Sequence, residues 1–99
     1  MDFKFANKPL EALYYLGAGR GKYPPGVMRA FFRRGISIQN ATDTRDLYAL
    51  KGARLKLLKG RSGFYSMRLN EQYRLILEFE GRGESKVVLI CDINKHYRE

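Results

Sequence analysis

The sequence predicts an α+β fold, with a short N-terminal strand and two helices packed on one face of a mainly antiparallel β-sheet. Apolar residues recur at helical spacing up to about residue 38 and alternate with polar residues from residue 54 onward. The length of 99 residues suits one core, so residues 1–99 are expected to form a single domain. Helices on one face would leave the other face of the sheet open.

The N-terminal half predicts one strand and two helices. Residues 2–6 alternate like a strand, and Asn7 is a suitable N-cap for the first helix, which ends in the glycine-rich stretch "GAGRGKYPP". That stretch lacks the spacing of a phosphate-binding loop, which favours a helix C-cap and a mobile loop. Pro24 and Pro25 open a second helix. Its expected buried stripe consists of Val27, Met28, Phe31, Gly35 and Ile38, whereas Arg29, Arg33 and Arg34 are expected on a solvated side.

After a capping and turn segment at residues 42–46, strands are expected at residues 54–59, 63–69, 73–80 and 86–93. A three-residue loop at residues 70–72 would place Leu69 opposite Tyr73 and Arg68 opposite Arg74, with both arginines on the open face. Like charges in this arrangement destabilise a sheet. Either an anion lies between them, or both guanidinium groups reach water or a carboxylate such as Glu71 or Glu78. In the last strand, Cys91 shares a face with Val87 and Leu89 and is expected in the core.

The charge distribution favours the first alternative. The net charge is +9, and no acidic residue occurs between Lys51 and Arg68, a segment with six basic residues. Such segregation indicates an anionic partner, which could be RNA, DNA or an acidic protein. No apolar run is long enough for a membrane span, and the N-terminus lacks a signal-peptide pattern. One cysteine fits a reducing compartment, so we expect a cytoplasmic protein without membrane contact. With only Cys91 and His96 as soft ligands, we expect no metal, and we also expect no cofactor.

The segment "ATDTRDLYALKGARLKLLKGRSGFYSMRLNEQYRLILEFE", the hydrophobic strand that follows and the closing "DINKHY" resemble the RelE/ParE superfamily of toxins. The similarity is greatest to the HigB-like branch of bacterial type II toxin–antitoxin systems. This resemblance implies a metal-independent messenger-RNA endoribonuclease that acts on the translating ribosome and arrests translation and growth. It implies three partners: messenger RNA, the ribosome and a cognate antitoxin, which we expect to be a helix-turn-helix protein encoded nearby.

The resemblance also suggests roles for individual residues. Arg74 would stabilise the transition-state phosphate, and Lys59 would supply a second cation. His96 would be the general base, with Tyr97 stacking on a base or transferring a proton. Asp92 matches an aspartate of the family, whereas His96 and Tyr97 are displaced and reversed in order. Lys56 stands at a position that can hold a histidine in relatives. The predicted RNA-binding residues are Lys51, Arg54, Lys56, Arg61 and Arg68.

Two other functions remain open from the sequence. ParE-like toxins share the fold and the hairpin signature but inhibit DNA gyrase without cutting RNA. A degenerate member would only bind its antitoxin or RNA. The tail with Asp92, His96 and Tyr97 favours the endoribonuclease, because a gyrase inhibitor needs no acid–base group.

Overall fold

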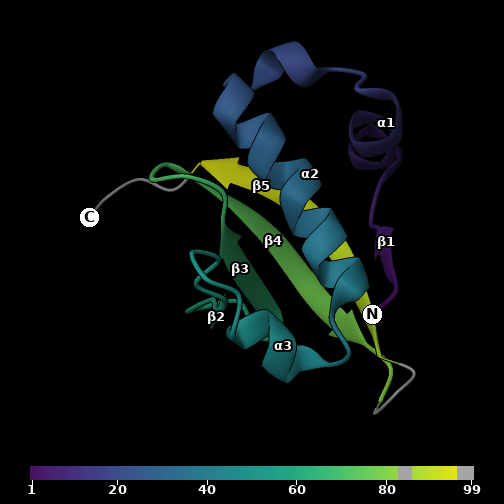
Figure 1. The fold of residues 1–99 in the computed structure, drawn as a ribbon, viewed down its shortest axis with the longest axis vertical. Coiled ribbons are helices and arrows are strands. Elements are labelled where there is room, and N and C mark those ends of the chain that lie inside the picture. Colours follow the sequence, from purple (N-terminus) through teal and green to yellow (C-terminus); the bar gives the residue numbers. More distant parts are fainter. Residues whose placement is uncertain (83–85, 96–99) are drawn as a thin grey trace.

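The computed structural model describes residues 1–82 and 86–95 and confirms the predicted α+β fold, with helices packed against a five-stranded sheet (Figure 1). The sheet order is β1-β5-β4-β3-β2, in which β1 pairs with β5 in parallel and all other neighbours are antiparallel. In the described part of the chain, no helix is long and apolar enough to cross a membrane. In chain order the elements are β1 (Phe3–Phe5), α1 (Lys8–Leu16), the 3-10 turn η1 (Arg20–Lys22), α2 (Pro25–Asn40), α3 (Thr44–Tyr48), β2 (Lys56–Leu57), β3 (Phe64–Arg68), β4 (Tyr73–Glu80) and β5 (Val87–Lys95).

The helices α1 and α2 begin where the sequence predicts, and α1 ends at the start of the predicted glycine-rich stretch. The side chain of Asn7 accepts a hydrogen bond from the Leu10 backbone N–H at 3.0 Å and so caps α1. Gly17 ends that helix with a positive φ of 69°, a conformation that glycine adopts without steric cost. The predicted stripe of α2 is buried. The helix lies across the sheet (Figure 1). The core therefore lies between α1, α2 and one face of the sheet.

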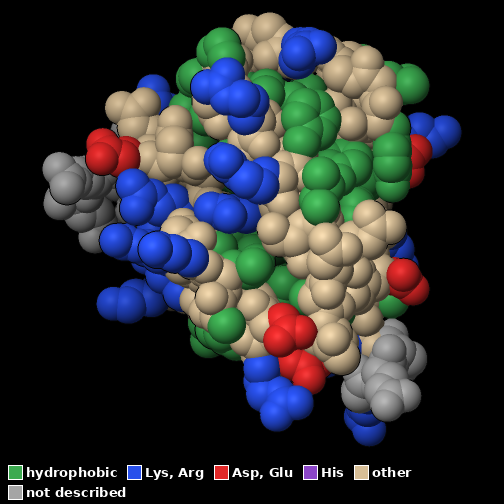
Figure 2. Space-filling model, viewed as in Figure 1, with side chains coloured by type: hydrophobic (Ala, Val, Ile, Leu, Met, Phe, Trp, Pro, Cys, Tyr) green, Lys and Arg blue, Asp and Glu red, His purple; other side chains and the backbone are tan. Residues whose placement is uncertain are grey.

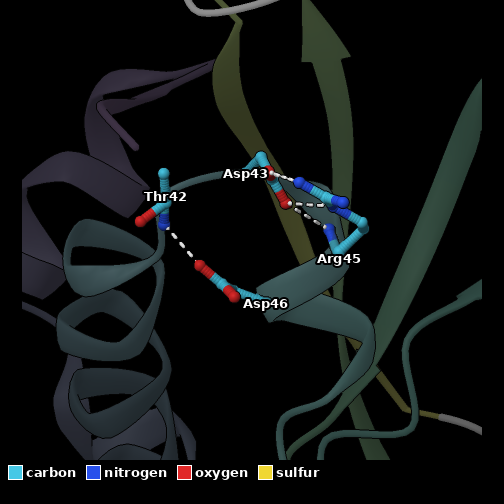
Figure 3. A network of polar contacts seen from close by, with 4 residues as sticks. All are labelled: Thr42, Asp43, Arg45 and Asp46. Carbon is cyan, nitrogen blue, oxygen red and sulfur yellow. Dashed lines mark hydrogen bonds and ion pairs between the residues drawn. The ribbon is translucent and has the colours of Figure 1, made fainter.

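The capping segment forms a short helix, α3, rather than only a turn. Asp43 accepts a hydrogen bond from the Arg45 backbone N–H at 2.9 Å and forms an ion pair with the Arg45 guanidinium (Figure 3). The Thr42 N–H donates to the Asp46 carboxylate at 2.7 Å, also drawn in Figure 3. These contacts satisfy backbone donors at the start of the helix, which fixes the path of the chain between α2 and the sheet.

The hairpin between β3 and β4 has the predicted register. Met67 lies opposite Leu75 and Arg68 opposite Arg74, and the Leu69 N–H donates to the Tyr73 carbonyl at 2.9 Å. The Asn70 side chain accepts hydrogen bonds from the backbone of Gln72 and Tyr73, which closes the three-residue loop. The apolar positions consequently face the helices, and the two arginines share the opposite face.

The prediction that Cys91 belongs to the core is wrong. A β-bulge in β5 pairs Leu77 with Ile90 but Ile76 with Asp92, which leaves Cys91 as an extra residue. The core positions of the strand are therefore Val88, Ile90 and Ile93. Cys91 is half-buried, and its Sγ lies 3.7 Å from Glu78 Oε2. Burial and the Glu78 carboxylate raise the pKa of the Cys91 thiol to about 11, so it is not a reactive thiolate at neutral pH.

Candidate functional site

The candidate site is built around Arg74, which projects from β4 on the face of the sheet opposite the helices. Burial, Arg68 and then Arg54 lower the pKa of the Arg74 guanidinium, although an arginine remains charged at any physiological pH. Arg54 comes from the loop before β2, where its backbone adopts a positive φ of 47°. We call Arg54, Arg68 and Arg74 the arginine cluster.

The two facing arginines are not neutralised by the carboxylates that the sequence left as an alternative. An Arg74 Nη1–H donates to Ser66 Oγ at 3.3 Å, and Arg68 Nε–H donates to the Asn70 carbonyl at 3.4 Å. Within residues 1–82 and 86–95, neither arginine forms an ion pair with Asp or Glu. Among the described residues, no carboxylate therefore neutralises the charge of this facing pair.

The face that carries Arg74 is only partly open, in contrast to the prediction. Ser66 and Ile76 lie on this face and are only 0% and 3% exposed. Residues of the turn between β2 and β3 line a hollow of about 210 Å³ on this face, together with residues from the start of β4 and the end of β5. We call this the basic hollow; its lining residues are Leu58, Lys59, Arg61, Arg74, Ile76, Asn94 and Lys95.

The composition of the basic hollow suits a phosphate group. Four of its seven lining residues are Lys or Arg, and none is Asp or Glu. Arg61 also lies over the Phe64 ring, with Cζ 4.3 Å from its centroid, which holds the guanidinium beside the sheet. Because Arg74 belongs to both the hollow and the arginine cluster, it connects the two.

On the helix face, Figure 2 shows Lys and Arg side chains gathered toward the side of β2 and β3.

Comparisons with known proteins agree with this fold. A family model described as "RelE-like toxin of type II toxin-antitoxin system HigB" matches residues 3–98. The chain belongs to the HigB-like toxin family. Its structure is similar to a "YoeB/ParE toxin from Agrobacterium tumefaciens", with a TM-score of 0.62, 18% identity, and coverage of 98% of this chain and 100% of that chain. At this identity the likeness supports the fold alone. No curated protein matches the chain significantly.

The structure brings some predicted site residues of this HigB-like toxin together and leaves others apart. Arg74, Lys59 and Arg61 line the basic hollow, and Arg54 and Arg68 join them through the arginine cluster. Lys56 pairs with Ser66 and so belongs to the same face, with an exposed side chain, and Lys51 is exposed in the loop before it. His96 and Tyr97 lie outside the described residues.

Asp92 lines a different hollow from Arg74. This second hollow, of about 160 Å³, lies beside α1 and η1 and includes Asn7, Lys22 and Tyr23. Burial is the main cause that raises the pKa of Tyr23, and the Asp92 carboxylate adds to it. Of these two hollows in the described part of the toxin, Asp92 lines one and Arg74 the other. Asp92 is nevertheless only two residues from Asn94, which lines the basic hollow.

Sequence reasoning missed Arg34 and Ser66. Arg34 was expected in solvent, but its Nε–H donates to the Arg68 carbonyl at 3.2 Å, and burial and then Arg33 lower the pKa of the Arg34 guanidinium. The available signal was its spacing, since Arg34 lies three residues after Phe31 and four before Ile38 on the buried side of α2. Ser66 had no such signal, because its burial depends on tertiary packing that a local pattern does not show.

Proposed function

We propose that this toxin is a messenger-RNA endoribonuclease that cleaves its substrate on the translating ribosome without a metal ion. The observation that supports this proposal is the basic hollow, where Arg74 lies with Lys59, Arg61 and Lys95 around an apolar floor at Ile76. A site for RNA cleavage must stabilise a phosphate that gains negative charge, and several cations in a partly enclosed hollow suit that requirement. Within the described residues, His, Cys, Asp and Glu side chains form no group that could hold a metal ion.

In the proposed reaction, the 2′-hydroxyl of one nucleotide attacks the adjacent phosphorus atom. The new O2′–P bond forms as the P–O5′ bond breaks, which yields a 2′,3′-cyclic phosphate and a 5′-hydroxyl. Arg74 and Lys59 stabilise the additional charge on the phosphate oxygens. A general base removes the 2′-hydroxyl proton and a general acid protonates the leaving 5′-oxygen.

His96 is the proposed general base, because it follows Lys95 in the chain and titrates near neutral pH. Tyr97 is the proposed stacking or proton-transfer residue. The participation of Asp92 stays a prediction from the family resemblance.

The proposed RNA path follows the cations in and beside the hollow. Lys51, Arg54, Lys56, Arg61 and Arg68 would contact successive phosphates, which gives affinity without sequence preference. As a type II toxin, the protein has an antitoxin as its partner. We propose that this antitoxin is a helix-turn-helix protein encoded next to the toxin gene and that it covers part of the basic surface.

The test of this function is induced expression followed by mapping of messenger-RNA 5′ ends. New ends in translated regions, and their formation by purified toxin with ribosomes and a chelator present, are the expected results. Growth arrest with intact messenger RNA and altered DNA supercoiling would instead identify a gyrase inhibitor. Normal growth and intact RNA would leave only a binding role.

A further inference from the structure

Ser66 is a buried polar residue in contact with the candidate site. Its side chain is 0% exposed, and it is the one polar or charged residue in the buried class within residues 1–82 and 86–95. It lies opposite Ile76 on β4 and Lys56 on β2, on the face that carries the basic hollow. A buried hydroxyl costs free energy unless it is hydrogen-bonded, so its partner matters.

That partner is the guanidinium of Arg74. An Arg74 Nη1–H donates to Ser66 Oγ at 3.3 Å, between residues that are diagonal neighbours on adjacent strands. Electrostatic repulsion favours an orientation of the Arg74 side chain away from its neighbours, because Arg74 faces Arg68 and lies near Arg54. Among the described residues, Arg74 has no ion-pair partner that would offset this repulsion. The contact with Ser66 opposes this repulsion and holds the guanidinium over the floor of the hollow.

The chemistry of the acceptor is important. A hydroxyl oxygen is neutral, so it occupies one of the five N–H donors of the guanidinium and leaves the positive charge uncompensated. A carboxylate in the same position would hold Arg74 more strongly but would neutralise the charge that a phosphate needs. A serine therefore orients Arg74 without competing with its ligand.

We infer that Ser66 is a positioning residue that sets the orientation of the Arg74 guanidinium in the basic hollow. Its contribution to cleavage rests on the proposed function, whereas its effect on the orientation of Arg74 does not. The experiment therefore has one part that requires no catalytic activity and one part that measures the reaction.

The first part follows rotation of arginine guanidinium groups by NMR in the complete protein. In the parent we expect slower rotation of the Arg74 guanidinium than of the exposed Arg29 guanidinium on α2. Ser66→Ala should accelerate the rotation of Arg74 and leave Arg29 unchanged. Equal rotation of Arg74 and Arg29 in the parent would overturn the inference, and this comparison needs no variant that has to fold.

The second part measures single-turnover cleavage of ribosome-bound messenger RNA. Ser66→Ala should lower the rate at saturating toxin by about two- to tenfold, the effect of one hydrogen bond, with the half-saturating toxin concentration unchanged. Ser37→Ala, which removes a hydroxyl from α2, should keep the parental rate. A folded Ser66→Ala protein at the parental rate, or one changed only in half-saturation, would contradict a positioning role. Absence of cleavage by the parent would reject the proposed nuclease function, and the NMR comparison would still decide the inference.

Discussion

At the scale of single residues, the main feature is a pair of like charges that the fold does not relieve. Arg68 and Arg74 lie opposite each other on β3 and β4, and no described carboxylate forms an ion pair with either. Facing like charges destabilise a sheet, and salt screens such repulsion. The arrangement therefore costs stability in the free protein, and this cost can be measured separately from function.

We predict that Arg68→Gln stabilises the protein while it weakens RNA binding. The free energy of unfolding should rise by a few tenths of a kcal/mol, and the gain should be larger at low salt than at high salt. Urea denaturation at two ionic strengths measures this difference, with Arg29→Gln on α2 as the control. A loss of stability in Arg68→Gln at low salt would contradict the assignment of repulsion to this pair.

At the scale of secondary-structure elements, α3 depends on a charged cap. The hydrogen bond and charge of Arg45 lower the pKa of the Asp43 carboxyl below its ordinary value of 3.8. A carboxyl group whose pKa is lower in the folded state stabilises the fold at pH values above its unfolded pKa. This stabilisation is lost as the pH falls through the folded pKa. We expect Asp43→Asn, which keeps an acceptor but not the charge, to approach the parent in melting temperature as the pH falls from 6 to 2. A difference in melting temperature between Asp43→Asn and the parent that stays constant from pH 6 to 2 would show that the charge of Asp43 does not contribute to stability.

The packing of α2 on α1 depends on the absence of a side chain at Gly35. A Cβ atom at this position would lie 2.5 Å from Tyr14 Cε1 and 2.6 Å from Cζ, and the Tyr14 ring is held by ring contacts that include Phe3, Phe5 and Phe31. Overpacking of this kind costs about 1–3 kcal/mol, which offsets the gain of about 1 kcal/mol from alanine in a helix.

Gly35→Ala should therefore lower the melting temperature. The control is Gly26→Ala in the same helix, where the nearest atom is Arg29 Nη2 at 3.7 Å, and it should be neutral or stabilising. Thermal melting of both variants makes the comparison. Equal stabilisation by the two alanines would show that Tyr14 moves aside without cost.

The sequence predicted elements best where one periodicity continues without interruption. The register of β3 and β4 followed from period-two alternation and a three-residue loop, and the bounds of β4 agree with the prediction. In β5 the same reasoning placed Cys91 in the core, because a bulge shifts the alternation by one residue and has no clear sequence signal. The second strand was expected over residues 54–59 but is limited to Lys56–Leu57, since Arg54 adopts a left-handed backbone conformation.

At the scale of the whole molecule, the candidate site depends on parts of the chain that are distant in sequence. The charges of Arg74, Lys59 and Arg61 could be predicted from composition and family resemblance. The hollow at Ile76, the link from Arg34 to β3 and the separate hollow of Asp92 could not, because each depends on how a loop or helix packs against the sheet. These features are tertiary, and local patterns do not encode them.

The excess of positive charge leads to a prediction about affinity for RNA. Each phosphate contact on a single strand releases a counterion, with a slope of about −0.7 in log affinity against log salt. Lys59→Ala should make this slope less negative by about 0.7–1, and Lys8→Ala on α1 should leave it unchanged. Fluorescence anisotropy with a short RNA over a range of salt concentrations measures both slopes. An affinity independent of salt would exclude a phosphate-binding surface.

The most direct test of the account is the cleavage rate of Arg74→Ala in a purified translation system, with folding checked by thermal melting. If Arg74 stabilises the transition-state phosphate, the rate at saturating toxin should fall on the order of 100-fold or more. Arg74→Lys should restore little of it, because an ammonium keeps the charge but lacks the planar two-pronged grip on phosphate. Arg29→Ala, on the opposite side of the sheet, should keep the parental rate. A folded Arg74→Ala protein that cleaves messenger RNA at the parental rate would contradict the assigned site.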